Sequence, residues 1–188
     1  KGSEGRTERV VELAERVRHT MDRMDKVFQE FLYMSKPASP EMEQVDLVAC
    51  LRDCVTLLAP RLEQAGVSVD LDVPPGALPV LAHEAAIRRA FMNVITNAEQ
   101  FSSAGGKIEV RARPERSGAV VEVMDRGPGI PESQLERVFD MFVTSRPGGT
   151  GLGLFLARAA VEKCGGTIRI ANRTGGGTVC TIALPAKG

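Results

Sequence analysis

The chain has 188 residues, of which 43% are apolar, so it is long enough for one domain with a sizeable core and an appendage. Its 24 basic side chains balance its 24 acidic ones, and this net charge of zero argues against a nucleic-acid partner. No apolar run approaches the roughly 18 residues of a membrane span and no signal peptide is visible, so we expect a cytoplasmic chain whose membrane attachment, if any, lies in parts outside it.

The first predicted element is a long helix over residues 9–36, which Pro37 and Pro40 bring to an end. Apolar residues recur in it at intervals of three and four, the spacing of a heptad seam. They are Val10, Leu13, Val17, Met21, Met24, Phe28 and Phe31. A lone helix with such a stripe needs a partner, so we expect a helical hairpin or a dimer. His19 lies off the seam, as either a solvated helix residue or a phosphate acceptor.

Four shorter elements are predicted before residue 83. Residues 45–47 are expected to form an extended link, and 48–65 a helix with one apolar face that ends at Gly66. Residues 67–73 alternate between apolar and polar types, which predicts a half-buried strand. Residues 80–82 can add a brief second strand.

A further helix is predicted over residues 84–101, with an apolar stripe toward the core and a polar row beside it. The row consists of Asn93, Asn97 and Gln100, whose spacing of four and three residues stacks them on one face. Asparagine is a poor residue for a helix interior unless something holds it there. The row therefore predicts either a pair of buried, hydrogen-bonded amides or a surface that faces a ligand or a metal ion.

The rest of the chain is predicted to consist mainly of strands. Residues 107–113 and 119–124 alternate as a hairpin, and residues 167–172 and 178–184 form a closing pair. Between these pairs, residues 152–164 are apolar on nearly all sides, which predicts a buried helix. This order of elements predicts an α+β fold, a two-layer sandwich in which a mixed, mostly antiparallel sheet carries helices on one face.

Two glycine-rich segments stand out in the second half of the chain. The first, residues 125–129, combines the carboxylate of Asp125 with two glycines, and the second, residues 148–153, leads into an apolar helix. Glycine lets the backbone approach a ligand closely, and the free N–H groups at a helix start attract phosphate. The two segments together predict a nucleotide site with the base at Asp125 and the phosphates near Gly151. The P-loop and Rossmann glycine patterns are both missing from the sequence.

Four motifs in order give the sequence a specific resemblance to a known family. They are Asn93-x-x-x-Asn97-Ala98, Asp125-x-Gly127-x-Gly129, Phe139-x-x-Phe142 and Gly149-Thr150-Gly151-Leu152-Gly153-Leu154. They resemble the N, G1, F and G2 boxes of the sensor histidine kinase catalytic domain, within the wider class that includes gyrase and Hsp90-type ATPases. The resemblance covers residues 45–185 and implies the Bergerat ATP-binding fold. Residues 31–37 are also similar to the end of the second dimerisation helix in nitrogen-regulator-like kinases.

The resemblance implies roles for single residues toward ATP and Mg²⁺. Asp125 would accept the adenine amino proton, supported by Thr178 through a water molecule. Asn97 would ligate Mg²⁺ with its amide oxygen, and Arg146, in a short lid over residues 143–149, would meet the γ-phosphate. The other implied nucleotide contacts are Phe101, Ile130 and Phe142 as apolar walls, Gly127 and Gly129 beneath the base, and Gln100, Thr150, Gly151, Leu152, Gly153 and Leu154 on the phosphate side.

Three positions depart from the family's pattern. Gln100 stands where a lysine is common, which removes one positive charge from the phosphate side, and His83 stands where an aspartate usually caps the helix. Asn93 replaces the glutamate that activates water in the ATPases of the class, and an amide cannot act as a general base. Asn93 therefore favours phosphoryl transfer to a protein side chain over hydrolysis.

The expected protein is thus the ATP-binding catalytic domain of a two-component sensor histidine kinase, residues 41–188, preceded by part of a dimerisation region, residues 1–40. The resemblance implies transfer of the ATP γ-phosphoryl group to a histidine and onward to the receiver domain of a response regulator, within a homodimer. His19 lacks the acidic neighbour of the family's acceptor and lies too close to Asn97, so the acceptor is expected outside this chain. An anti-sigma-type serine kinase and a nucleotide-gated interaction module without catalysis stay open as alternatives.

Overall fold

The computed structural model describes residues 41–146 and 149–186, together with residues 9, 13–18, 20, 21, 24 and 28. The described residues before position 30 are all helical, as the periodicity predicts. The seam side chains among them, from Leu13 to Phe28, are 50–67% exposed. Val10, His19 and Phe31, and the segment 31–37, lie outside the described residues.

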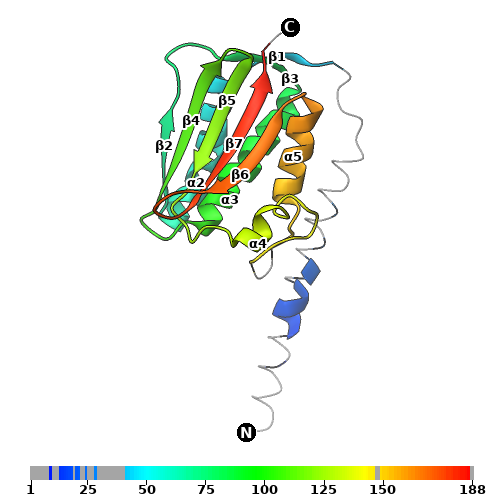
Figure 1. Ribbon diagram of the computed structural model, residues 1–188. Coiled ribbons are helices and arrows are strands. Elements are labelled where there is room, and N and C mark those ends of the chain that lie inside the picture. The colour runs from blue at the N-terminus through cyan, green and yellow to red at the C-terminus, as the bar shows by residue number, and fades with distance from the viewer. Residues whose placement is uncertain are drawn as a thin grey trace.

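A five-stranded sheet forms the frame of the molecule (Figure 1). In spatial order its strands are β2 (Ser68–Asp72), β4 (Lys107–Glu115), β5 (Gly118–Met124), β7 (Thr178–Pro185) and β6 (Thr167–Asn172). β2 and β4 run parallel, and the other three neighbouring pairs are antiparallel. The prediction of a mixed, mostly antiparallel sheet is therefore confirmed. A separate two-stranded sheet pairs β1 (Glu43–Asp46) with β3 (Pro79–Ala82).

Three helices pack on one face of the five-stranded sheet, which confirms the predicted two-layer sandwich (Figure 1). They are α2 (Leu47–Ala65), α3 (Glu84–Phe101) and α5 (Gly153–Lys163), and α4 (Glu132–Leu135) is a single turn near one end of the sheet. The side chain of Asp46 accepts a hydrogen bond from Val48 N (3.0 Å) and so caps the start of α2. Gly66, with φ of 65°, ends that helix, as its sequence position predicts. Within the described ranges, no helix is long and apolar enough to cross a membrane.

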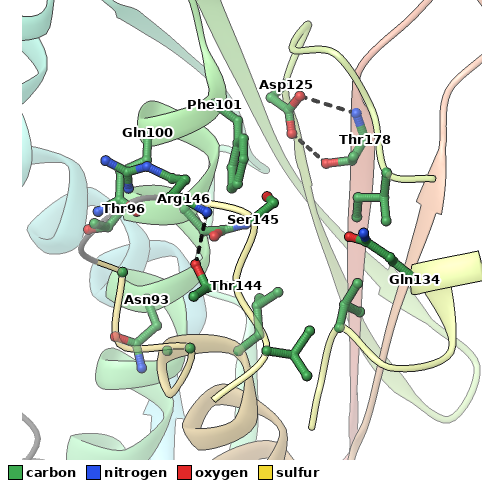
Figure 2. Close-up of a pocket in the computed structure, with 18 of the residues that line it drawn as sticks. Asn93, Thr96, Gln100, Phe101, Asp125, Gln134, Thr144, Ser145, Arg146 and Thr178 are labelled. Carbon is green, nitrogen blue, oxygen red and sulfur yellow. Dashed lines mark hydrogen bonds between the residues drawn. The ribbon is translucent and has the colours of Figure 1, made fainter. Parts of the chain in front are cut away.

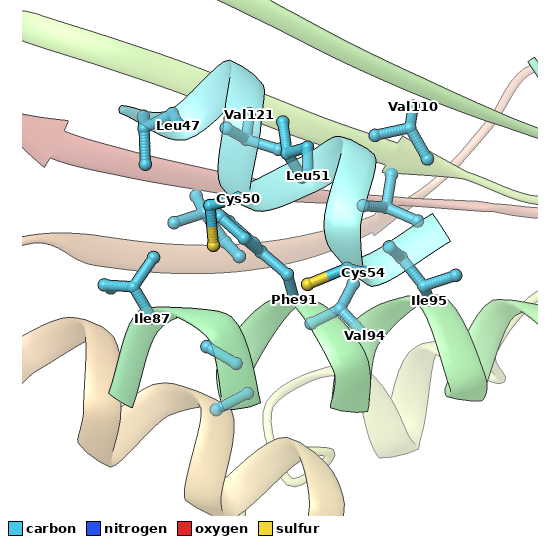
Figure 3. Packing of buried hydrophobic residues seen from close by; sticks show 14 of the residues in the cluster. Leu47, Cys50, Leu51, Cys54, Ile87, Phe91, Val94, Ile95, Val110 and Val121 are labelled. Carbon is cyan, nitrogen blue, oxygen red and sulfur yellow. The ribbon is translucent and has the colours of Figure 1, made fainter. Parts of the chain in front are cut away.

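The hydrophobic core lies between these helices and the sheet (Figure 3). α3 contributes Ile87, Phe91 and Ile95, each 0% exposed, and the sheet contributes Val110 and Val121, also fully buried. Burial of this apolar stripe fixes the rotation of α3 about its axis. The polar row on the adjacent side of α3 is therefore held in one direction, away from the core.

Three predicted elements differ from the structure. α5 was expected to be buried on all sides, but only one face is buried, and on the other face Arg158 pairs with Glu162 at 2.7 Å. The prediction counted its alanines as apolar, although alanine need not be buried. The extended link predicted over residues 45–47 is extended at Val45 and Asp46, but these two residues belong to strand β1, because β3 pairs with them, and Leu47 begins α2. The loop between the strands predicted over residues 107–113 and 119–124 is a tighter turn than expected, since β4 and β5 stay paired as far as Glu115 and Gly118.

Candidate nucleotide-binding site

The polar row of α3 lines one side of a cavity of about 510 Å³ (Figure 2). Asn93, Asn97 and Gln100 all face it, together with Thr96 and Phe101. They do so because the apolar stripe of the same helix is buried in the core. Two hypotheses were open for these polar residues. A surface that faces a ligand therefore fits the structure better than a pair of buried amides.

The opposite side of the cavity comes from the segment after β5, from α4 and the residues next to it, and from the start of β7. Its lining residues are Asp125, Gly129, Ile130, Pro131, Gln134, Val138 and Thr178. β5 and β7 are antiparallel neighbours, with Met124 paired to Val179, so the end of one strand meets the start of the other. This pairing brings Asp125 and Thr178 together although they lie far apart in the sequence.

The described residues between Val143 and the start of α5 form the third side. Residues 143–146 and 149–151 line the cavity, as do Gly153 and Leu154 in the first turn of α5. The first N–H groups of a helix have no partner within it and carry the positive end of its dipole. A buried carboxylate and a helix start thus border one cavity, whose volume lies in the usual range for small-molecule sites, roughly 300–1,000 Å³.

Asp125 is the only acidic residue among the described residues that line the cavity, and it is 4% exposed. Its Oδ1 accepts hydrogen bonds from Gly127 N (2.8 Å) and Thr178 N (3.2 Å), and its Oδ2 accepts one from the Thr178 hydroxyl. A carboxylate offers about four acceptor positions, so about one stays open to an N–H donor of a ligand. The expectation that Thr178 acts through a water molecule is corrected, because the strand pairing brings its hydroxyl into direct contact.

Two of the site glycines are required by contacts within the protein. A Cβ on Gly127 would lie 2.5 Å from the carbonyl oxygen of Phe101, so glycine lets the turn after β5 pack on the end of α3. Gly151 has φ of 68°, and a Cβ there would lie 2.5 Å from the carbonyl carbon of Phe142. These glycines set the shape of the cavity wall through chain packing.

Two cations line the cavity among its described residues. The guanidinium of Arg146 lies over the ring of Phe101, 6.0 Å from the ring centre. Arg61 enters from α2 and forms an ion pair with Glu99 at 2.7 Å. Both therefore bring positive charge to the cavity wall.

Two buried side-chain atoms lack a hydrogen-bond partner among the described residues, Asn93 Nδ2 and His83 Nδ1. An unpaired buried polar group costs about 1–3 kcal/mol. Asn93 borders the cavity, so a ligand acceptor could satisfy its amide. His83 precedes α3 and makes no capping bond with its side chain, which agrees with its departure from the usual aspartate.

The structure brings most of the predicted site residues to one cavity. Those that line it are Asn93, Asn97, Gln100, Phe101, Asp125, Gly129, Ile130, Arg146, Thr150, Gly151, Gly153, Leu154 and Thr178. Gly127, Phe142 and Leu152 are not among its lining residues. The Phe142 side chain is 65% exposed, so the apolar wall expected from it comes instead from Val138 and Val143.

Several lining residues had no individual role in the sequence-based prediction. They are Arg61, Thr96, Pro131, Gln134, Val138, Val143, Thr144, Ser145 and Gly149. Thr96 could have been found, because it lies three residues after Asn93 and four before Gln100 on the same helical face. Arg61 could not, since only the packing of α2 beside α3 brings it to the cavity.

The donors around the cavity fit a nucleotide with a hard cation. No group of three or more His, Cys, Asp or Glu side chains that could hold a metal ion occurs in the described part of the chain. A metal ion here would therefore depend on an amide oxygen, on ligand oxygens and on water, a set that suits Mg²⁺. Asn97 can supply the amide oxygen, because it lies in the cavity wall.

Comparison with known proteins adds independent findings. Residues 82–188 match the family described as "Histidine kinase-, DNA gyrase B-, and HSP90-like ATPase". The chain is 31% identical over 166 residues to the signal transduction histidine-protein kinase AtoS of Escherichia coli (strain K12), a match that covers 88% of the chain and 27% of AtoS. It is 29% identical over 176 residues to the sensor histidine kinase ZraS of the same strain, covering 94% of the chain and 38% of ZraS. The chain thus spans well under half of these curated relatives.

Solved structures show the same fold. The mycobacterial sensor histidine kinase MprB superposes with a TM-score of 0.70 and 30% identity, over 78% of this chain and 98% of that one. The histidine kinase ThkA in complex with the response regulator protein TrrA gives a TM-score of 0.76 at 24% identity, over 89% of this chain and 48% of that one.

Proposed function

Because the chain belongs to the histidine kinase-, DNA gyrase B- and HSP90-like ATPase family and carries the catalytic ATP-binding domain of two-component sensor histidine kinases, we propose that it binds Mg·ATP in the cavity beside α3. In the intact protein, the γ-phosphoryl group of ATP would pass to a histidine and then to the receiver domain of a response regulator. The observation that supports this assignment best is a buried acceptor, Asp125, in the same cavity as the glycine-rich start of α5.

At the base end, Asp125 would receive the adenine amino group. Its carboxylate keeps about one acceptor position free, and adenine presents an N–H donor where guanine presents a carbonyl oxygen. Gly129, Ile130 and Phe101 line the cavity beside it and would lie against the base. Adenine would therefore be favoured over guanine by hydrogen-bond polarity.

At the phosphate end, Asn97 would hold Mg²⁺ through its amide oxygen, and the bound ion would neutralise phosphate charge during transfer. The backbone N–H groups from Gly151 to Leu154 would donate to phosphate oxygens. Gln100 and Thr150 would add neutral hydrogen bonds, and Arg146 would approach the γ-phosphate. Catalysis by such a site would consist of positioning and charge stabilisation.

Asn93 supports phosphoryl transfer rather than hydrolysis. It lines the cavity with an unpaired Nδ2, and an amide of this kind can donate a hydrogen bond but cannot take a proton from water. Asn93 would therefore orient a phosphate oxygen or the incoming acceptor.

We propose the same division of the chain as the sequence suggests. Residues 41–188 would form the catalytic domain, and residues 1–40 would belong to a dimerisation region of the nitrogen-regulator-like type. The seam from Leu13 to Phe28 supports a homodimer, because each of its five described apolar side chains is at least half exposed. The acceptor histidine would lie outside this chain, in a protein whose catalytic part works in the cytoplasm, where ATP is available.

The metal role of Asn97 separates this function from simple nucleotide binding. Asn97→Ala should weaken ATP binding by about tenfold in the presence of Mg²⁺, because the only proposed protein ligand of the ion is removed. In EDTA the same variant should bind ATP nearly as the wild type does. Isothermal titration calorimetry under both conditions measures the difference.

Gln64→Ala is the matched control for that experiment, since it deletes an exposed amide on α2 away from the cavity. It should bind like the wild type with and without Mg²⁺. Equal losses for Asn97→Ala with Mg²⁺ and in EDTA would contradict the metal role.

A further inference from the structure

The β6–β7 loop contacts the adenine-facing turn, residues 125–130, from outside the cavity. Asn172 ends β6 and Arg173 follows it, and neither residue lines the cavity. Both nevertheless hydrogen-bond to the backbone of the turn. We propose that Asn172 and Arg173 are positioning residues that hold Asp125 in place for adenine recognition, an inference that rests on the function proposed above.

Asn172 holds the far end of the turn. Its Oδ1 accepts a hydrogen bond from Ile130 N (2.8 Å), and its Nδ2 donates one to Ile130 O (2.7 Å). The amide thus replaces a neighbouring strand and satisfies both backbone groups of one residue. A Cβ on Gly129 would lie only 3.0 Å from Asn172 Oδ1, so the glycine allows this close approach.

Arg173 holds the near end of the turn. Its Nη1 donates a hydrogen bond to the backbone oxygen of Asp125 (3.0 Å), while its own backbone N–H donates to Gly177 O (3.0 Å). Asp125 N in turn donates to Thr178 O (3.1 Å). Both backbone groups of Asp125 are therefore tied to the 173–178 segment, independently of its carboxylate.

The guanidinium of Arg173 is itself held by an anchor on the sheet. Its Nη2 contacts Glu109 Oε1 at 3.2 Å, and Arg126 and Arg111 contact the same carboxylate at 3.3 and 2.8 Å. Burial alone would raise the pKa of Glu109, but the bonds from Arg173 and Arg126 hold this pKa below its ordinary value. Glu109 therefore stays ionised at neutral pH, and Arg173 has a charged partner on one side and the turn on the other.

Such fixing matters because Asp125 has little acceptor capacity to spare. A donor of the ligand must reach the one free acceptor position of the carboxylate. If the turn changes conformation, that position is correctly placed in only a fraction of the molecules. Apparent affinity falls in proportion to the fraction of molecules that hold the binding geometry. Asn172 and Arg173 would raise that fraction without touching the nucleotide.

The test uses the full 188-residue chain and two variants, Asn172→Ala and Arg173→Lys. Lysine keeps the charge beside Glu109, but one ammonium cannot reproduce the fork that bridges Glu109 and Asp125 O. Affinities for ADP and GDP are measured by competition against a fluorescent ADP analogue, and melting temperatures are recorded. Each variant should lose about tenfold in ADP affinity, the effect of one or two hydrogen bonds, and should lose much less in GDP affinity.

Arg111→Ala is the matched control, because it removes another guanidinium from Glu109 without a bond to the turn. It should keep the wild-type preference for ADP over GDP. Unchanged ADP affinity in Arg173→Lys and Asn172→Ala would overturn the inference, as would equal losses for ADP and GDP that track a fall in melting temperature. Failure of the wild type itself to bind ADP would instead contradict the proposed function. Failure of the inference and failure of the proposed function therefore give different results.

Discussion

At the scale of single residues, the site depends on how many acceptor positions Asp125 has left. Three hydrogen bonds from Gly127 and Thr178 occupy most of its carboxylate. These bonds fix the side chain and leave about one acceptor position for a ligand donor. An amide at this position would have only one oxygen for all the donors around it, and its nitrogen would face donors.

Asp125→Asn should therefore reduce ADP affinity by about 10- to 100-fold, the range expected when a hydrogen bond to a charged group is lost and a donor is left unpaired. Calorimetry measures the change. Asp70→Asn is the control, since it makes the same substitution on an exposed residue of β2 and should bind ADP normally. An affinity unchanged by Asp125→Asn would remove this carboxylate from the site.

Residue patterns predicted the parts of the site that depend on local spacing. Asn93, Asn97 and Gln100 could be placed on one face from helical periodicity alone, and all three line the cavity. Patterns could not show that Thr178 contacts Asp125 directly, or that Arg61 reaches the cavity from α2. These contacts follow from which strands and helices are neighbours, information that single-sequence periodicity does not contain.

At the scale of elements, the glycine-rich segment is shaped by a tight crossing of two backbones. Gly151 has φ of 68° and lies against Phe142, whose own φ of 66° is the one positive value among the described residues that are not glycine. Phe142 N donates a hydrogen bond to Gly151 O at 3.0 Å. The crossing sets where the segment leaves the cavity and where α5 starts.

Gly151→Ala should disturb this crossing, because an added Cβ would approach the Phe142 carbonyl carbon to 2.5 Å and the backbone conformation is costly for alanine, by about 1–2 kcal/mol. The melting temperature should fall by about 3–6 °C, and ADP affinity should fall with it. Differential scanning calorimetry and titration measure both. Gly76→Ala, where an added Cβ meets nothing within 4 Å, should change neither. A stable, tightly binding Gly151→Ala would show that the crossing can relax freely.

Elements with a strong periodic pattern were predicted closely. α3 spans Glu84–Phe101, the range predicted from its apolar stripe, and α2 begins one residue before its prediction. α5 was mispredicted as buried all round, since alanine tolerates either environment and leaves the pattern ambiguous. β1 was predicted as an extended link and not as a strand, because its pairing with β3, another four-residue strand, leaves little pattern in the sequence.

At the scale of the whole molecule, the catalytic domain is one part of a larger arrangement in its relatives. The chain covers 27% of AtoS and 38% of ZraS, so most of each relative lies outside the matched region. Before the domain, the five described seam residues from Leu13 to Phe28 are each at least half exposed. Under the function proposed above, a domain that holds ATP next to such a helix would bring the nucleotide to a separate helical acceptor.

This arrangement predicts that the chain alone binds ATP but does not label itself. With Mg²⁺ and γ-labelled ATP, wild type should incorporate no more acid-labile phosphate than Asn97→Ala, because His19 lacks the acidic neighbour of a family acceptor. Nucleotide binding in the same sample, followed by calorimetry, shows that the site is active. Acid-labile label in wild type that disappears in His19→Gln would instead place the acceptor in this chain. Label that appears only when upstream sequence of the intact protein is included would locate the acceptor there, since phosphoryl transfer requires the histidine within reach of the γ-phosphate.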